Sequence, residues 1–198
     1  EAIKYLKIGA DSGNSNAMFG YSSMLLRHYQ TESEKNVALK YLKMAIERGN
    51  IDAMNQYGTY LIRGDIVPKN IEEAIKYYKM AIDKGSAKAM YNYGISLFKG
   101  EMLPENKEEG IKYLKMGAEK EGKDAMTNYG LILIRGLGVE PNIEEGIKYL
   151  KKSIELHNDI EAIRCYATLL LTGGVIPKNV EESLKYFQMG AKHKDINC

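Results

Sequence analysis

The sequence from residue 87 to residue 122 reads AKAMYNYGISLFKGEMLPENKEEGIKYLKMGAEKEG. Its second half contains the phrase Ile-Lys-Tyr-Leu-Lys, and close variants of this phrase return every 36 residues along the chain. The tyrosines at their centres are Tyr5, Tyr41, Tyr77, Tyr113 and Tyr149, followed by Tyr186 after one additional residue. Self-similarity at such a period is typical of a solenoid, in which each unit buries its apolar face against its neighbours.

The first half of this unit has the periodicity of an amphipathic helix. Its apolar and small residues fall on one helical face: Ala89, Met90, Tyr93, Gly94, Leu97 and Phe98. Gly100 follows and is expected to end the helix in the left-handed conformation that glycine adopts easily. The same glycine recurs in the neighbouring units as Gly64, Gly136 and Gly173. The first half therefore predicts a helix of about 13 residues.

The second half begins with an asparagine that precedes two glutamates. The Asn106 side chain can accept from an early backbone N–H, and Glu109 can reach back as in a capping box. The equivalent asparagines are Asn70, Asn142 and Asn179. Paired carboxylates can also perform general acid–base catalysis. Because these pairs recur at each helix start, we interpret them as caps, and each unit as a helical hairpin.

We predict an all-α, right-handed α/α superhelical solenoid of about five 36-residue helical hairpins. The expected division is a partial repeat followed by five repeats: 1–14, 15–50, 51–86, 87–122, 123–158 and 159–195. First helices are expected near 15–27, 51–63, 87–99, 123–135 and 160–172. Second helices are expected near 1–13, 36–49, 71–84, 107–120, 143–156 and 180–193. The chain starts inside a second helix without a capping asparagine, so we expect it to be a segment of a longer protein.

The repeated pattern resembles the Sel1-like repeat, a helical hairpin related to the tetratricopeptide repeat. The residues that carry the resemblance in one unit are Ala53, Tyr57, Gly58, Leu61, Gly64, Ala74, Tyr77, Tyr78, Ala81 and Gly85. The resemblance covers essentially the whole chain, and it implies a non-enzymatic scaffold or adaptor that brings other proteins together. Because the family has no shared catalytic residues, the resemblance implies no catalytic residue in this sequence. Ser22 and Ala167 stand where Gly58 does, so we expect looser helix contact in the outer units.

Composition excludes several other classes of protein. The net charge of +2, from 28 basic and 26 acidic residues, is too balanced for a nucleic-acid-binding surface. No apolar run approaches the roughly 18 to 20 residues of a membrane span. Two cysteines, Cys165 and Cys198, are too few for a disulfide framework, which favours a cytoplasmic location. Secretion through a removed signal peptide stays open.

The residues give little support to an enzyme. The histidines His28, His157 and His193 lie apart, without the convergent ligands that a zinc site or a nucleophile–base pair needs. No glycine-rich phosphate-binding loop occurs, and the fifteen tyrosines are explained by packing at repeat positions. We therefore expect no cofactor, no metal and no catalytic residue. Cys165 is expected to be an ordinary thiol on an outward face.

The candidate binding surface is the concave face, which first helices line in solenoids of helical hairpins. A projection at 100° per residue places these candidate partner-binding residues outward: Arg27, Asn55, Gln56, Thr59, Arg63, Tyr91, Asn92, Ile95, Lys99, Thr127, Asn128, Leu131, Arg135, Arg164 and Thr168. Four of the five repeats place a cation at the last turn of the first helix: Arg27, Arg63, Lys99 and Arg135. This column suits an extended acidic peptide or a terminal carboxylate. It could equally serve only to stabilise helix C-termini.

Two other functions remain as alternatives. The array could be a regulatory or targeting domain of a larger enzyme, such as a kinase, or, less favoured, an RNA- or polysaccharide-binding module. The expected partners are other proteins or extended, possibly acidic, peptides. An isolated segment could also associate with itself end to end.

Overall fold

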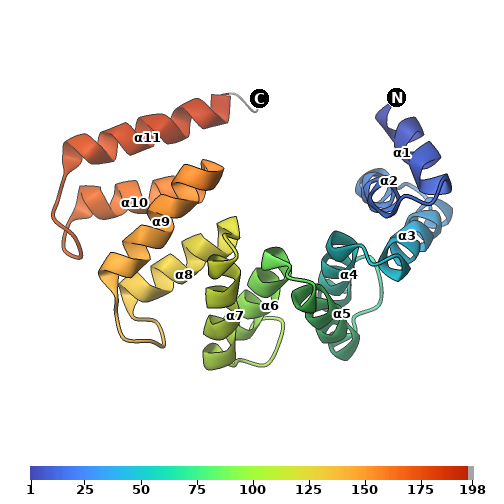
Figure 1. The fold of residues 1–198 in the computed structure, drawn as a ribbon, viewed down its shortest axis with the longest axis horizontal. Helices are drawn as coiled ribbons and strands as arrows, with labels where there is room; N and C mark the ends of the chain where they lie inside the picture. Colours follow the sequence, from blue (N-terminus) through green and yellow to red (C-terminus); the bar gives the residue numbers. More distant parts are fainter. Residues whose placement is uncertain (196–198) are drawn as a thin grey trace. The chain divides into compact units, whose positions relative to one another are not determined.

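The computed structural model describes residues 1–195, with the side chains of residues 1–192 (Figure 1). His193 and Cys198 therefore lie outside the described side chains. The described residues form helices and no strand. The helices are α1 (Ala2–Asp11), α2 (Ser15–His28), α3 (Glu32–Glu47), α4 (Ile51–Arg63), α5 (Ile71–Asp83), α6 (Ala87–Lys99), α7 (Lys107–Glu119), α8 (Lys123–Arg135), α9 (Ile143–His157), α10 (Ile160–Thr172) and α11 (Val180–Asp195). The expected all-α solenoid is confirmed.

The helices pair in chain order into hairpins, each made of a first helix and a second helix. The pairs are α2–α3, α4–α5, α6–α7, α8–α9 and α10–α11, and α1 packs on α2 as a second helix without a described partner before it. The chain divides into two compact units, Glu1–Ala89 and Met90–Cys198, and each is considered by itself below. In the second unit the core consists of buried residues that line up between consecutive hairpins.

Each hairpin is closed by a pair of tyrosine rings. A tyrosine of the first helix meets a tyrosine of the second helix edge to face, with ring centroids 4.9 to 5.3 Å apart. The five pairs are Tyr21–Tyr41, Tyr57–Tyr77, Tyr93–Tyr113, Tyr129–Tyr149 and Tyr166–Tyr186. The repeated tyrosine phrase is therefore an internal packing element. A lysine of the preceding second helix covers two of these rings, Lys43 over Tyr57 and Lys151 over Tyr166.

The loops inside the hairpins correct one detail of the capping prediction. Each capping asparagine accepts from the backbone N–H of the glutamate at the third helical position, at 3.0 to 3.1 Å. Its backbone N–H is already engaged, because it donates to a carbonyl of the first helix, as Asn70 does to Leu61. The glutamate carboxylate accepts from the asparagine side-chain amide instead, at 2.9 to 3.3 Å. The capping asparagine therefore also connects the two helices of its hairpin, through its backbone hydrogen bond to the first helix.

The loop before α3 is built differently from the others. Thr31 accepts from the backbone N–H of Glu34 at 3.2 Å, and the Glu34 carboxylate accepts from the backbone N–H groups of Thr31 and Gln30. This is a full capping box. The hydrogen bonds from Gln30 and Thr31 lower the pKa of Glu34. Because Thr31 caps the helix, α3 begins at Glu32, four residues before the expected start at residue 36.

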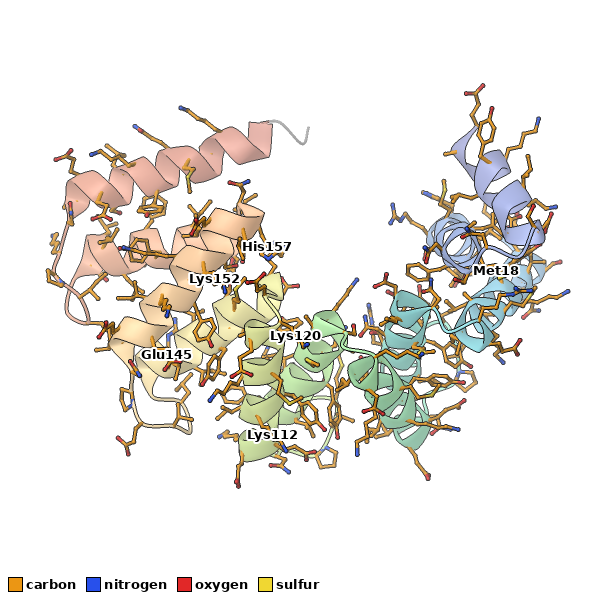
Figure 2. All side chains as sticks on the ribbon, in the orientation of Figure 1. Met18, Lys112, Lys120, Glu145, Lys152 and His157 are labelled. Atoms are coloured by element: carbon orange, nitrogen blue, oxygen red, sulfur yellow. The ribbon has the colours of Figure 1, made fainter. Side chains whose placement is uncertain are left out.

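The extra residue between the fourth and fifth repeats lies at the end of α9. Asn158 adopts a left-handed conformation (φ 47°) and caps this helix, which is two residues longer than α5 and α7. His157 Nε2 lies 2.8 Å from the carbonyl oxygen of Glu121, and Lys152 Nζ lies 3.0 Å from its carboxylate. Figure 2 shows both side chains on α9. The end of α9 is thereby held against the turn between α7 and α8.

Candidate functional site

The first helices supply every residue of the expected binding face, but the structure does not expose all of them. One column of positions, represented by Asn55 and Thr127, was expected to point outward. Both residues are only 1% exposed. The projection was wrong here because it treats each helix alone and takes no account of the neighbouring hairpin; Thr127, for example, contacts the N-cap residue of the next first helix. Arg164, at the same position in α10, is exposed.

Thr127 shows what this column does inside the second unit. Its hydroxyl donates to Asp159 Oδ2 at 2.6 Å, and the hydroxyl of Ser153 donates to the same oxygen at 3.0 Å. Asp159 Oδ1 accepts from the backbone N–H of Glu161, so this carboxylate caps α10. All three polar side chains are buried. Thr127 therefore links α8, α9 and α10 and is not available to a partner.

Several other candidates are half-buried and bonded to neighbours. In the first unit, Thr59 Oγ1 lies 3.1 Å from the Tyr78 hydroxyl, and Gln56 is half-buried. In the second unit, the side-chain amide of Asn128 donates to the carbonyl of Asp124 at 2.9 Å. Asn92, Ile95 and Leu131 are also half-buried. These residues therefore present only part of their surface to a partner.

The four cations of the expected column are all exposed at the ends of their helices. In the first unit, Arg63 pairs with Asp65 at 3.1 Å, which offsets part of its charge. Arg27 and Arg63 both act on the Tyr60 hydroxyl, where they lower a pKa that burial raises. In the second unit, Arg135 makes no ion pair with a described residue. The column therefore differs from one repeat to the next.

A cleft of about 300 Å³ lies between α8 and α10 in the second unit. It brings together four of the expected residues: Leu131, Arg135, Arg164 and Thr168. The remaining lining residues are Glu161, Cys165 and Leu169. We call this the α8–α10 cleft. Two of these residues were not predicted from the sequence. Glu161 lies one helical turn before Arg164, and Leu169 follows Thr168 directly, so neither falls in the projected columns.

The charges in the α8–α10 cleft leave an excess of one cation. Arg164 Nη2 donates to Glu161 Oε1 at 2.5 Å and its Nε donates to Glu161 Oε2 at 3.2 Å. Arg135 lies in the same cleft and has no ion-pair partner among the residues that the structure describes. The Thr168 hydroxyl donates to the carbonyl of Arg164 at 2.8 Å and keeps its lone pairs free to accept. The arrangement suits a ligand that presents a carboxylate and a hydrogen-bond donor.

Cys165 gives the cleft no reactive thiolate. Burial raises the pKa of the Cys165 thiol, the charge of Glu161 raises it further, and Arg164 and Arg135 lower it by less. The thiol is therefore protonated near neutral pH and acts as a small apolar group. Among the described residues, no cluster of three His, Cys, Asp or Glu side chains could hold a metal ion. Within the same residues, every helix is too short or too polar to cross a membrane.

The comparisons with known proteins agree with this architecture. The Sel1 repeat model matches residues 1–14, 15–50, 51–86, 87–121, 123–158 and 160–195. The chain therefore belongs to the Sel1 repeat family. Proteins of this family generally mediate protein–protein interactions and are typically non-catalytic. No curated protein matches the chain.

Solved structures with the same fold come from several bacteria. A Sel1 repeat protein from Oxalobacter formigenes has a TM-score of 0.84 at 23% identity, over 96% of this chain and 78% of its own. The protective antigen c5321 of uropathogenic Escherichia coli has a TM-score of 0.77 at 22% identity, over 96% of this chain. This chain spans 41% of the length of c5321. Immunity protein Pa5087 from Pseudomonas aeruginosa has a TM-score of 0.66 at 18% identity, over 89% of this chain and 64% of its own.

Proposed function

We propose that this chain is a non-enzymatic scaffold that binds partner proteins through its first helices, and that it takes an acidic segment of a partner in the α8–α10 cleft. The observation that carries this proposal is the position of Arg135, an exposed guanidinium without an ion-pair partner among the described residues, at the edge of that cleft. Family membership supports the general role in protein binding.

The chemistry of the cleft favours a carboxylate next to an apolar group. A guanidinium forms strong, two-pronged hydrogen bonds with carboxylates, because its planar N–H groups match the two oxygens. Leu131 and Leu169 supply apolar contact beside Arg135, and Thr168 can accept from a backbone N–H of the partner. An extended peptide with an Asp or Glu beside an apolar residue meets all three groups.

Peptide binding to the full chain tests this proposal. Short peptides that contain Asp or Glu beside Leu or Val are compared with twins in which Asn or Gln replaces the acid. We expect the chain to prefer the acidic members, to bind them less tightly as salt rises, and to lose the preference in the variant Arg135→Glu. The matched control is Lys148→Glu, which makes the same charge change at an exposed position of a second helix.

Two results would contradict the proposal. One is an equal affinity for acidic and amide peptides. The other is an equal loss in Arg135→Glu and Lys148→Glu, because a general effect of net charge would then explain the binding.

A further inference from the structure

The α8–α10 cleft contains two guanidinium groups, and one of them is already paired. Arg135 comes from the last turn of α8 and Arg164 from the first half of α10, and both line the cleft. Glu161 lies one helical turn before Arg164 and accepts from its Nη2 at 2.5 Å and from its Nε at 3.2 Å. Both carboxylate oxygens of Glu161 are therefore engaged with this guanidinium, in the two-pronged geometry that such pairs favour.

This pair has no counterpart in the other first helices. They have uncharged residues at the position of Arg164, namely Phe19, Asn55, Tyr91 and Thr127. At the position of Glu161 they have Asn16, Asp52, Lys88 and Asp124. Of these, Asp124 pairs with the residue next to it, Lys123, at 3.6 Å. The pair between Glu161 and Arg164 therefore belongs to this cleft and is not a general feature of the repeat.

All three charges of the cleft act on one group, the thiol of Cys165. Its Sγ lies 3.7 Å from Glu161 Oε1. Burial raises the pKa of this thiol, the charge of Glu161 raises it further, and Arg164 and Arg135 lower it. A ligand group that lies beside Cys165 would consequently meet two cations and one anion.

The exposure of the pair decides what Glu161 contributes. The side chains of Arg164 and Glu161 are 66% and 52% exposed, and ion pairs as exposed as this add little to stability. The effect of Glu161 on an acidic ligand is of another kind. A second carboxylate of the ligand would be repelled by Glu161 and would have to displace it to reach Arg164.

We propose that Glu161 sets the specificity of the α8–α10 cleft by competing with the ligand for Arg164. With Glu161 in place, the cleft reads one carboxylate, at Arg135, and a second acid beside the first adds no affinity. Glu161 is a positioning residue for Arg164 and a competitor of the ligand. This inference rests on the proposed binding of an acidic segment, and it adds how many acids of that segment the cleft recognises.

Three peptides test the number of acids. They differ at two consecutive positions beside a leucine, which are Asn-Asn, Asp-Asn or Asp-Asp. Fluorescence anisotropy with the full chain should show that Asp-Asn binds more tightly than Asn-Asn. The affinity for Asp-Asp should lie within about twofold of that for Asp-Asn, because Arg164 is occupied.

The variant Glu161→Gln should change that result. Because Arg164 is then free, Asp-Asp should bind about fivefold more tightly than Asp-Asn. The matched control is Glu144→Gln, which makes the same charge change at an exposed position in the first turn of α9. It should behave as the parent chain does. The double variant Glu161→Gln, Arg164→Gln should lose the fivefold gain, because the second acid then has no guanidinium to meet.

A second measurement needs no peptide. In a chain with Cys198→Ser, Cys165 is the single cysteine. Its rate of disulfide exchange is measured with dithiobis(nitrobenzoate), which is dianionic, and with dithiodipyridine, which is neutral. A change in the thiolate fraction alters both rates alike, so their ratio reports how the cleft attracts an anion. Glu161→Gln should raise the ratio of anionic to neutral rate by about threefold, and Glu144→Gln should leave it unchanged.

Two outcomes of the peptide assay would overturn the inference. One is an equal gain from the second acid in Glu161→Gln and Glu144→Gln, and the other is a gain that persists in the double variant. Failure of the proposed function gives a different result, in which the parent chain binds Asn-Asn and Asp-Asn alike. The ratio of exchange rates then decides the inference alone, and an unchanged ratio in Glu161→Gln overturns it.

Discussion

The hairpins α8–α9 and α2–α3 follow the same repeat but meet in different ways where their helices cross. In α8–α9 the crossing is made by Gly130 and Gly146, and a Cβ added at Gly146 would lie 2.6 Å from the carbonyl oxygen of Gly130. In α2–α3 the same two positions are Ser22 and Ala38, both buried. The helix backbones approach closely at the two glycines of α8–α9, whereas in α2–α3 a hydroxymethyl group and a methyl group occupy the same two positions. The comparison shows that the repeat tolerates two modes of helix contact.

The hairpin α6–α7 uses the same glycine contact, since a Cβ at Gly110 would lie 2.7 Å from the backbone nitrogen of Phe98. In α10–α11 the positions are Ala167 and Ser183, and the Ser183 hydroxyl donates to the carbonyl of Ala167 at 2.8 Å. Ser22 Oγ, by contrast, has no hydrogen-bond partner among the described residues. The outer hairpins therefore replace the glycines in two ways, one with the hydroxyl satisfied and one without.

The largest effect is expected where the next repeat packs on α8–α9. Asp159→Ala removes the N-cap of α10 and the nearest acceptor of the buried Thr127 and Ser153 hydroxyls, which keep only the longer bonds to Ser153 Oγ at 3.1 Å and to the carbonyl of Lys123 at 3.3 Å. We therefore expect a loss of about 3 kcal/mol. The corresponding change after α2–α3 is Asn50→Ala, which removes a cap and one bond to Asn16. It should cost about 1 kcal/mol. Urea unfolding of both variants measures the difference, and equal losses would contradict the assigned role of Thr127 and Ser153.

The next effect concerns the crossing itself. Gly146→Ala would force apart backbones that approach closely, at a cost only partly offset by the better helix propensity of alanine, so we expect a net loss of about 2 kcal/mol. Lys148→Ala, an exposed change on the same helix, is the control and should be almost neutral. If Gly146→Ala instead stabilised the chain, the close crossing would not constrain α8–α9.

A smaller effect of opposite sign is expected at the crossing of α2–α3. Ser22→Ala removes a buried hydroxyl that has no partner and should stabilise the chain by about 1 kcal/mol. The matched change Ser183→Ala breaks the bond to Ala167 and should destabilise it by about the same amount. Thermal unfolding of both variants checks the signs. Equal losses would mean that the Ser22 hydroxyl is satisfied.

The last prediction concerns the tyrosine pairs, which both kinds of hairpin share. Their titration should leave the free energy of unfolding unchanged at neutral pH and lower it only at high pH. Burial raises the pKa of Tyr93 from 10.0 to about 12, and it also raises the pKa values of Tyr129 and Tyr149. The unfolded chain therefore releases these protons at lower pH than the folded chain. Their contribution to stability is complete below pH 10.0 and is lost as pH rises toward about 12. Urea midpoints across this range should fall, and Tyr93→Phe should reduce the slope. A constant midpoint would contradict the burial of these hydroxyls.

The sequence was sufficient for most of the fold, because glycine and asparagine mark the helix ends in each repeat. The bounds of α4, α6, α8 and α10 agree with the expected first helices. The start of α3 was wrong because Thr31 caps it without the repeated motif. The sequence predicted part of the lining of the α8–α10 cleft. Arg135 and Arg164 lie at outward positions that recur in each repeat, whereas Glu161 does not. The burial of Asn55 and Thr127 could not be predicted, because it depends on how neighbouring hairpins pack. The periodicity of a single helix carries no information about that packing.

Amide chemical-shift mapping of the isotope-labelled chain with an acidic peptide from the binding assay tests the central claim most directly, namely that partners bind on the first helices. The account predicts shifts on α8 and α10 around Arg135 and Thr168, which disappear in Arg135→Glu. Shifts confined to the second helices, or shifts that persist unchanged in Arg135→Glu, would contradict it.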